Sequence, residues 1–383
     1  MMSRYYFYVG SWQSPRNPDA VRGITIGTYE NGKLTPIKHV HEDVNVSMLT
    51  YDEKRQVLYT SNELPLTEKG PGGRALAYKV DLKSGDLEEI SNISSYGKMP
   101  DFVAYDPLGS FLVLTHHSMG NVILKTEQDE NGEFRLIEEY DETAAVLYEL
   151  GGEGAIIRAC DIVKHTGHGG TPEQTNPHMH SARFTPDGRY VFISDKGNDG
   201  YYSYRLDREN KKLVLADRLA SVPGAAPRYS ALHPSLPIIY FNNESARLLT
   251  ALKYSDDGKL EKIGDWSTVT DEVRDDQDPM QSDLKISDDG RFIYNIVRED
   301  NLISVFETDP ETGEPKLIQV TEAAGTGRER DLCFSPDGKY LFLSAMADGN
   351  VYRYTIGEDG KLSDKELALR DIAPGAMIFI KAD

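Results

Sequence analysis

ARFTPDGRY at residues 182–190 and LCFSPDGKY at residues 332–340 are two copies of one pattern. Each copy has a short apolar segment, a turn built on Pro-Asp-Gly, and a second segment that begins with Tyr. Asp-Gly between alternating apolar segments is a strong β-hairpin signal, because the tight turn needs a residue that tolerates positive φ. A third copy, ISDDGRF at residues 286–292, lacks only the proline. The pattern therefore predicts a chain built from repeated antiparallel hairpins.

The repeat extends along the chain in degenerate copies. The last apolar residue of each first strand serves as a marker, which gives Tyr51, Tyr105, Phe184, Leu232, Ile286 and Phe334. The spacings of 54, 79, 48, 54 and 48 residues indicate a period of about 50 residues, the length of a four-stranded β-propeller blade. The spacing of 79 predicts an insertion of about 30 residues, at about 143–177.

Both ends of the chain carry partial copies of the repeat. Residues 374–380 resemble a first strand, residues 5–10 a second strand and residues 23–29 a third strand. Joined in one sheet, they form a seventh blade that leaves no open sheet edge. An open solenoid or two sandwiches would not need complementary half-repeats at the two ends. The sequence therefore predicts an all-β, seven-bladed propeller as one domain over residues 1–383, closed by pairing of the N- and C-terminal strands.

The charge of the chain limits its partners. Lys and Arg number 42, Asp and Glu number 62, and the net charge is −20. A strongly acidic surface repels phosphate backbones and anionic lipids, which argues against nucleic acid and membrane partners. No run of 18 apolar residues could span a bilayer. These features predict a cytoplasmic enzyme, as a monomer or weak homo-oligomer, whose anionic substrate would need a local basic pocket.

The register of the repeat predicts where such a pocket lies. In a propeller blade the first strand lines the axis and runs antiparallel to the second, so the start of one and the end of the other share a face. Counting back four residues from each marker gives Ser47, Asp101, His180, Arg228, Ser282 and Arg330, with Gly375 in the closing blade. The ends of the second strands are Trp12, Glu63, His117, Lys196, Glu244, Arg298 and Met346. Packing alone would fill equivalent positions alike, whereas these differ and gather several cations at one mouth.

At these positions the chain resembles a known family, the propeller lactonases that include 6-phosphogluconolactonase and the fungal 3-carboxy-cis,cis-muconate lactonizing enzyme. The resemblance covers nearly the whole chain. It is carried by YVGS at residues 8–11, VKHTG at 163–167, PHMHS at 177–181, Pro227-Arg228, Asn243-Glu244, Arg298 and Arg330-Asp331. It implies a carboxylic ester hydrolase that opens a sugar-derived, phosphorylated lactone, as in the pentose phosphate pathway. It also implies a catalytic set of one His, two Arg and one Glu, which corresponds to His180, Arg228, Arg298 and Glu244.

The residue types suit hydrolysis of a lactone. Histidine is the usual base near neutral pH, so we expect His180 to be the general base, with Glu244 orienting it or serving as a second acid or base. Arginine captures carboxylate or phosphate and can stabilise an oxyanion, which are the roles expected for Arg228, Arg298 and Arg330. The other polar residues of the mouth are expected to bind substrate, namely His178, His117, Glu63, Asp101 and Lys196. The simpler interpretations are a strand-end His180 bonded to backbone groups and a Glu244 that only forms a salt bridge.

Six of the nine histidines lie between residues 116 and 180, which raises the question of a metal site. His178 and His180 alternate on a strand, so only one of them can face a given site, and no zinc-type spacing is present. We therefore expect no metal and no other cofactor. His165 and His168 are expected to order the insertion beside the mouth.

Two other functions fit parts of the pattern. A cycloisomerase that forms or opens a carboxymuconate lactone would use a similar arginine-rich pocket. A binding scaffold without enzymatic activity would show apolar patches on a blade face and would not need the His, Arg and Glu set. If the chain is a lactone hydrolase, the expected ligand is a small anionic sugar lactone.

Overall fold

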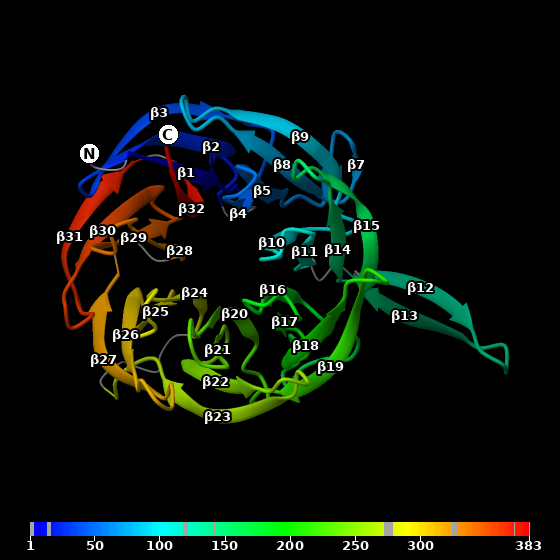
Figure 1. Ribbon diagram of the computed structural model, residues 1–383. Coiled ribbons are helices and arrows are strands. Elements are labelled where there is room, and N and C mark those ends of the chain that lie inside the picture. The colour runs from blue at the N-terminus through cyan, green and yellow to red at the C-terminus, as the bar shows by residue number, and fades with distance from the viewer. Residues whose placement is uncertain are drawn as a thin grey trace.

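The computed structural model describes residues 4–13, 17–117, 122–140, 143–271, 279–323, 328–370 and 372–382. Seven four-stranded antiparallel sheets surround one axis, which confirms the predicted seven-bladed propeller (Figure 1). From the axis outwards, the blades are β32(Pro374–Lys381)–β1(Tyr5–Ser11)–β2(Gly23–Glu30)–β3(Lys33–Val40); β4(Val46–Asp52)–β5(Val57–Asn62)–β8(Arg74–Val80)–β9(Leu87–Ser94); β10(Pro100–Tyr105)–β11(Phe111–His116)–β14(Ala145–Leu150)–β15(Ile156–Val163); β16(Met179–Phe184)–β17(Tyr190–Asp195)–β18(Gly200–Asp207)–β19(Lys212–Ala220); β20(Pro227–Leu232)–β21(Ile238–Asn243)–β22(Leu248–Tyr254)–β23(Leu260–Ser267); β24(Gln281–Ile286)–β25(Phe292–Val297)–β26(Leu302–Thr308)–β27(Pro315–Glu322); and β28(Glu329–Phe334)–β29(Tyr340–Ala345)–β30(Asn350–Ile356)–β31(Leu362–Leu369).

The ring is closed by the two chain ends, as predicted. Strand β1 pairs antiparallel with β32, with Tyr8 opposite Ile378 and Phe7 opposite Phe379. The seven inner strands contact one another in order around the axis, and β32 meets β4 to complete the circle. The N- and C-termini consequently lie side by side in one blade (Figure 1).

The Pro-Asp-Gly segments form the predicted hairpin turns. Strands β16 and β17 are joined by residues 185–189, in which Gly188 has a φ of 65° and its N–H donates to the Thr185 carbonyl. Thr185 also donates its hydroxyl hydrogen to Asp187. Gly338 occupies the same place between β28 and β29 with a φ of 68°. A side chain at this backbone angle would be strained, which explains why the repeat keeps glycine here.

A tyrosine on the second strand fastens each of several blades to the next one. The hydroxyl of Tyr240 donates to the carbonyl oxygen of Gly313 at 2.6 Å, and Tyr59 does the same to Gly154 at 2.7 Å. Both glycines have positive φ, and an added Cβ would come within 3.0 Å of the tyrosine oxygen. These bonds satisfy phenol groups that are otherwise buried between sheets. Tyrosines of the second strands therefore hold neighbouring blades together.

The predicted insertion at about 143–177 covers only part of the extra length and includes two strands of the blade itself. Residues 145–150 and 156–163 form β14 and β15, the third and fourth strands of an ordinary blade. The extra length comes partly from a separate hairpin, β12(Val122–Gln128) and β13(Phe134–Tyr140), between the second and third strands of that blade, and partly from the connection between β15 and β16. The two strands of this hairpin contain apolar residues on either side of Asp-Glu-Asn-Gly at residues 129–132, so their sequence resembles a strand pair of a blade.

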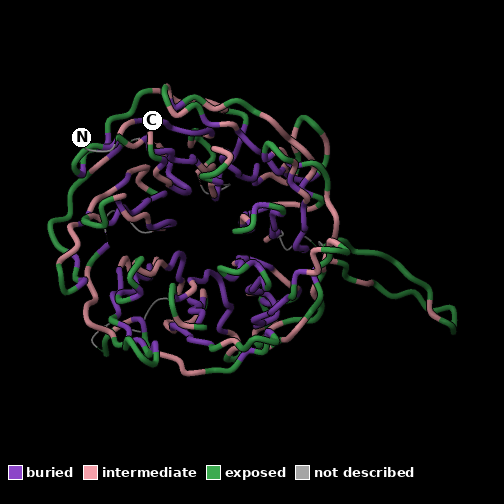
Figure 2. Tube along the Cα trace, in the orientation of Figure 1, coloured by how far each residue is buried: buried purple, intermediate pink, exposed green. Residues whose placement is uncertain are grey.

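Burial follows the position of a strand in its blade. Inner and second strands are almost fully buried, whereas the outer strands are half-buried and the β12–β13 hairpin is exposed along its length (Figure 2). The core consists of apolar clusters between adjacent sheets, rich in Tyr, Phe, Val, Leu and Ile. No helix in the described ranges is long and apolar enough to cross a membrane.

Candidate active site

The first strands change register at the same place in all seven blades. In the blade of β16 and β17, for example, Met179 pairs with Asp195 but Ser181 pairs with Ser194, so His180 is an extra residue in the strand. A β-bulge of this kind re-aims the side chain of the extra residue. The seven irregular positions contain Ser47, Asp101, His180, Arg228, Ser282, Arg330 and Gly375. The residues counted from the repeat thus coincide with a bulge at the mouth of each blade.

Residues from three consecutive blades meet around His180. Its Nε2 accepts a hydrogen bond from Nε of Arg228 at 2.9 Å, and its Nδ1 lies 2.8 Å from a carboxyl oxygen of Asp101. The same Arg228 Nε lies 2.9 Å from one oxygen of Glu244, and Lys196 Nζ lies 2.6 Å from the other. Because Arg228 donates to Nε2, the proton of a neutral His180 ring resides on Nδ1, toward Asp101. Asp101, and not the predicted Glu244, is the carboxyl group beside Nδ1, although the two atoms are not aligned for a hydrogen bond.

Burial and neighbouring cations keep His180 neutral. The side chain is 3% exposed, and burial, with Arg228 the largest charge contribution, lowers its pKa well below the usual range. Burial and the nearby Glu63 raise the pKa of Asp101 well above its usual range. A neutral imidazole at physiological pH has the lone pair that a general base requires.

Glu244 is held in its ionised form. Burial opposes ionisation, but Lys196 and Arg228 outweigh it and lower the pKa of Glu244. A carboxylate fixed by two cations is a poor proton donor or acceptor near neutral pH. This arrangement favours the salt-bridge interpretation of Glu244, in which it positions Arg228 beside His180.

A second group lies on the other side of the mouth. Arg330 Nη2 donates to Glu63 Oε2 at 3.1 Å, and the Arg330 guanidinium carbon lies 4.1 Å from the centre of the Trp12 ring. Arg330 and Glu63 belong to blades separated by the closing blade, so their contact shows that the strand ends converge. Burial raises the pKa of Glu63, although Arg330 opposes this effect. Trp12 was placed at the mouth by the repeat, but its stacking on arginine was not predicted.

Two guanidinium groups present hydrogen-bond donors that no described residue accepts. Nε of Arg298 and Nε of Arg330 are buried without a partner in the described ranges. Burial, followed by the charge of Arg228, lowers the pKa of Arg298 to about 9, and Arg330 acts in the same direction. Arg298 thus lies within electrostatic reach of both other arginines. Unpaired buried donors are costly, and an anionic ligand would satisfy them.

The two remaining predicted histidines lie beside His180. The His117 ring is centred 5.1 Å from the His180 ring and 5.2 Å from the His178 ring. His178 Nδ1 also contacts the His117 carbonyl oxygen, and its backbone N–H donates to Asp195. Burial lowers the pKa of His178. Both residues therefore form a wall of the His180 site.

His165 has a structural place outside the mouth. Its Nδ1 lies 2.6 Å from Asp195, its Nε2 lies 2.9 Å from the hydroxyl of Tyr204, and its ring stacks on Tyr202 with 3.6 Å between centres. These contacts tie the connection after β15 to the next blade. His168 is exposed, and its Nδ1 lies 2.9 Å from the carbonyl oxygen of the neighbouring Gly169.

The mouth contains as many acids as cations, which differs from the simple basic pocket expected. Its cations are Lys196, Arg228, Arg298 and Arg330, and its carboxyl groups are Glu63, Asp101, Glu244 and Glu329. The pKa is raised for three of these acids, and only that of Glu244 is lowered. A raised pKa favours the protonated form of these acids and so reduces the negative charge of the mouth, which favours an anionic ligand.

Glu329 was missed by the sequence analysis. It is the first residue of β28, one position before Arg330, and it is fully buried. Both of its carboxyl oxygens lack a hydrogen-bond partner among the described residues, and burial raises its pKa to about 7. The other inner strands begin with Val46, Pro100, Met179, Pro227, Gln281 and Pro374. A charged residue in this uncharged series is the signal that could have identified it.

Replacing Glu329 with Gln is expected to stabilise the protein above pH 7. The unfolded chain releases this proton near pH 4.5, whereas the folded chain keeps it to about pH 7. The folded state therefore binds more protons in that window, and stability falls as pH rises through it, by on the order of 3 kcal/mol. Gln281, at the equivalent position, donates its amide to three backbone carbonyls, so the fold accepts an amide there.

Urea unfolding at pH 5 and pH 8 measures this effect. At pH 8 the Glu329→Gln variant should have a larger free energy of unfolding than the parent. Its free energy of unfolding should also differ less between pH 5 and pH 8. Glu314→Gln, at an exposed position, is the control and should match the parent at both. Equal pH dependence in Glu329→Gln and the parent would refute the burial of a protonated carboxyl group.

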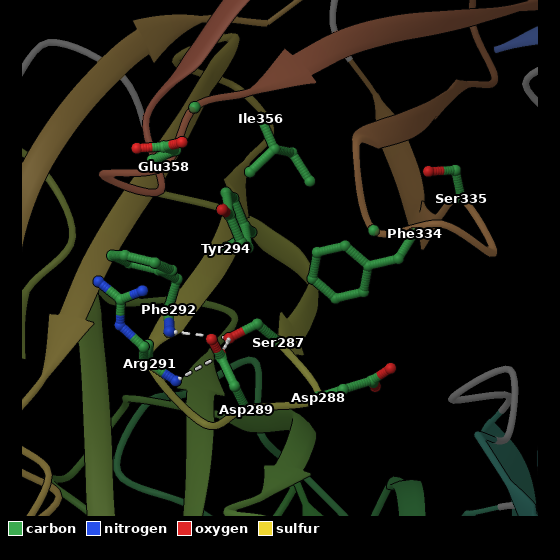
Figure 3. Close-up of a pocket in the computed structure, with 12 residues that line it drawn as sticks. Ser287, Asp288, Asp289, Arg291, Phe292, Tyr294, Phe334, Ser335, Ile356 and Glu358 are labelled. Carbon is green, nitrogen blue, oxygen red and sulfur yellow. Dashed lines mark hydrogen bonds between the residues drawn. The ribbon is translucent and has the colours of Figure 1, made fainter. Parts of the chain in front are cut away.

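A different cavity lies at the opposite ends of the inner strands. It has a volume of about 350 Å³ and is lined by residues of the β24–β25 and β28–β29 turns, together with Ile356 and Glu358 (Figure 3). Arg291 there lies over the ring of Phe292, and Asp289 accepts the hydroxyl hydrogen of Ser287. None of the predicted site residues lines this cavity, so it offers controls for substitutions at the mouth.

The clustered histidines do not come together as a metal-binding group. Among the residues that the structure describes, no set of three or more His, Cys, Asp or Glu side chains is arranged to hold an ion. His116 is fully buried and bonds the Ala144 carbonyl through Nδ1, while His165 faces Asp195 and Tyr204. His116 and His165 therefore lie in environments separate from the group of His117, His178 and His180.

Comparison with known proteins places this geometry among characterised chains. The family model described as "Lactonase, 7-bladed beta-propeller" matches residues 6–379. The 6-phosphogluconolactonase of Bacillus subtilis (strain 168) is 26% identical over 351 residues, which cover 91% of this chain and 90% of that protein. The 6-phosphogluconolactonase of Formosa agariphila is 26% identical over 364 residues, or 93% and 94% of the two chains. The periplasmic gluconolactonase of Pseudomonas aeruginosa shares the fold, with a TM-score of 0.82, 20% identity and 99% of each chain covered.

Proposed function

The chain belongs to the lactonase family of seven-bladed β-propellers. We propose that it hydrolyses a phosphorylated sugar lactone, the activity for which its relatives, the 6-phosphogluconolactonases, are named. The site of this reaction is the mouth around His180 and Arg228. The resemblance noted in the sequence is confirmed at the level of the family, and the substrate and the residue roles are the proposal.

One observation carries the choice of an anionic substrate. The buried Nε donors of Arg298 and Arg330 have no partner among the described residues, and they lie within electrostatic reach of each other and of Arg228. Two arginines with open donors, beside a third arginine, suit a phosphate, which accepts several charge-assisted hydrogen bonds. An uncharged lactone would leave these donors unsatisfied. The phosphate is therefore assigned to Arg298 and Arg330.

Hydrolysis then proceeds beside His180. Nε2 of His180 takes a proton from water as the water oxygen attacks the lactone carbonyl carbon. Arg228 stabilises the oxyanion that forms on the carbonyl oxygen. The bond between the carbonyl carbon and the ring oxygen breaks, and the protonated His180 returns its proton to that oxygen. The product is the open hydroxy acid. Its new carboxyl group carries the oxygen and the second proton of the attacking water.

The contact between Arg228 and His180 gives substrate a role in activating the base. In the free enzyme Arg228 donates to the His180 lone pair, so Nε2 is already occupied. A bound carbonyl oxygen that attracts Arg228 would release Nε2 for water. Lys196 and Glu244 limit how far Arg228 can move, because Glu244 holds both cations.

A panel of lactones tests the proposed function. Hydrolysis of 6-phosphogluconolactone should exceed that of unphosphorylated gluconolactone by at least tenfold in kcat/KM, and a carboxymuconate lactone should be a poor substrate. Faster turnover of the carboxymuconate lactone would favour the cycloisomerase. Absence of turnover for every lactone by a folded protein would favour a binding scaffold.

Changing Arg298 to Lys is expected to raise KM for the phosphorylated lactone about 10- to 100-fold with little change in kcat. Lys keeps the charge but loses the planar pair of donors, and a charge-assisted hydrogen bond contributes about 1.5–3 kcal/mol. Steady-state kinetics with and without the phosphate measure the effect, which should be confined to the phosphorylated substrate. Arg291→Lys, in the cavity of Figure 3, is the matched control and should leave KM unchanged. A drop in kcat instead would assign Arg298 to the oxyanion.

The cytoplasmic location stays a prediction. One protein that shares the fold is named as a periplasmic gluconolactonase, so the fold alone does not decide the compartment. Fractionation of the source cells with an antibody to the native chain tests the location directly.

A further inference from the structure

The β12–β13 hairpin is an arm with two unlike faces. In its register Leu124 lies opposite Glu138 and Gln128 lies opposite Phe134, so alternate residues share a face. One face is mainly apolar, with Val122, Leu124, Phe134, Leu136 and Tyr140 beside the polar Thr126, Gln128 and Glu138, whereas Ile123 and Ile137 lie on the other face. The other face is charged and holds the ion pairs Lys125–Glu139 and Arg135–Glu127.

The apolar face is open to solvent. Leu124 is 61% exposed, Leu136 is 69% exposed and Phe134 is 76% exposed. The arm points away from the ring, and its whole length is exposed (Figures 1 and 2). An isolated two-stranded hairpin is marginally stable in water and needs a hydrophobic face packed on something else. The arm is therefore expected to have a partner surface.

A second exposed apolar surface lies at the base of the arm. It is formed by the outer strands β15 and β19, which contact each other, and we refer to these two strands as the rim. Ile157 is 55% exposed and Leu215 is 54% exposed, with Ile162 and Val214 also exposed beside them. Among the described residues, nine of the 16 exposed large apolar side chains belong to the arm or the rim. Such clustering indicates an interaction site rather than scattered surface residues.

Charge distinguishes between the possible partners of the arm. Residues 122–140 contain two basic and six acidic side chains, a net charge of −4. The rim strands carry Arg158, Lys212 and Arg218, and their two acids are turned inward, where Asp161 accepts from Leu213 N and Asp217 accepts from Leu260 N. Two arms would repel each other, whereas an arm and a rim attract.

The exposed area matches what a stable dimer needs. The eight of these side chains that lie on the apolar face of the arm or on the rim together expose an area on the order of 800 Å², which is what one partner contributes to an interface of standard size. A monomer seldom leaves a patch of more than about 300–600 Å² uncovered. Two copies related by a two-fold axis would each bury both surfaces, because every arm meets the other copy's rim.

We propose that this chain forms a homodimer in which each β12–β13 arm lays its apolar face on the β15 and β19 rim of the other copy. The interface is isologous and lies at the outer edge of the propeller, away from the His180 mouth. Each active site is complete within one copy, and dimerisation is independent of the proposed lactonase function.

Sedimentation velocity of the full chain, from about 1 to 100 µM, tests the proposal. The parent should have twice the chain mass of 42.8 kDa. The arm variant Phe134→Glu/Leu136→Glu and the rim variant Ile157→Glu/Leu215→Glu should each weaken dimerisation at least 100-fold. The control Ile37→Glu changes a residue that is 53% exposed on β3, another outer strand, and should stay dimeric. All variants should hydrolyse the lactone within twofold of the parent.

A mixture of the two variants shows which surface of the other copy the arm binds. An arm variant and a rim variant together retain one intact arm–rim contact, so equal amounts should form a heterodimer that neither forms alone. A monomeric parent at 100 µM, or an arm variant that stays dimeric, would overturn the proposal. If the arm variant loses the dimer and the rim variant keeps it, the arm binds the arm of the other copy and not its rim. Because the arm lies in solvent, its variant tests the proposal even if the rim variant misfolds.

Discussion

Replacing His180 with Asn is expected to lower kcat for the lactone by about 10²–10⁴, with KM changed by no more than about threefold. Asn can accept the hydrogen bond from Arg228 but cannot take a proton from water, so the pocket keeps its shape and loses its base. General base catalysis acts in the transition state, and its loss therefore appears in kcat. Steady-state kinetics on 6-phosphogluconolactone, with thermal unfolding as a check on folding, measure the change.

Two further variants separate the roles around His180. Asp101→Asn should give a smaller loss in kcat, because it disturbs the atom 2.8 Å from Nδ1 but leaves the imidazole in place. His168→Asn changes an exposed histidine outside the mouth and should leave kcat unchanged. Near-normal turnover by His180→Asn would remove His180 as the base and leave the buried acids of the mouth as the candidates.

The fold could be predicted because the repeat is local and its turns have a strict chemistry. Residues 182–190 and 332–340 each form the hairpin that their Asp-Gly requires, and the period places seven blades around the axis. The half-repeats at the two ends were enough to predict the pairing of β1 with β32. The bounds of the insertion were partly wrong because a β-hairpin outside the ring has the same kind of strands and turn as a strand pair inside it. Only the packing around a strand distinguishes the two.

The positions of the site followed from the register, whereas the pairings within it did not. Counting from the markers reached Asp101, His180, Arg228 and Arg330, because each blade has its bulge at that place. Which carboxyl group lies beside His180 depends on contacts between blades, and a count along one strand carries no such information. Glu329 was missed for a related reason, since its register position is filled by uncharged residues in every other blade.

Removing residues 374–383 is expected to prevent stable folding of the whole chain. The deletion removes β32, whose buried Ala376, Met377 and Ile380 fill the space between its neighbours. Strand β1 would lose its inner partner, and Asp331 would lose the backbone N–H of Met377, from which it now accepts a hydrogen bond. Loss of one buried Met or Ile side chain alone costs about 2–5 kcal/mol, and a folded domain has only about 5–15 kcal/mol in total. The truncated chain should lose cooperative thermal unfolding and lactonase activity together.

A peptide with the sequence of residues 374–383 supplies the test of this explanation. Added in excess to the truncated chain, it should restore cooperative unfolding, because binding to the folded form stabilises that form. A peptide with Asp in place of Met377 and Ile380 should fail, since both side chains are buried and each belongs to an apolar cluster of the core. A truncated chain that unfolds cooperatively at the temperature of the parent would show that six blades close the ring without β32. We expect the truncated chain not to fold because β1 would have an open edge, which no other strand in the described ranges is placed to cover.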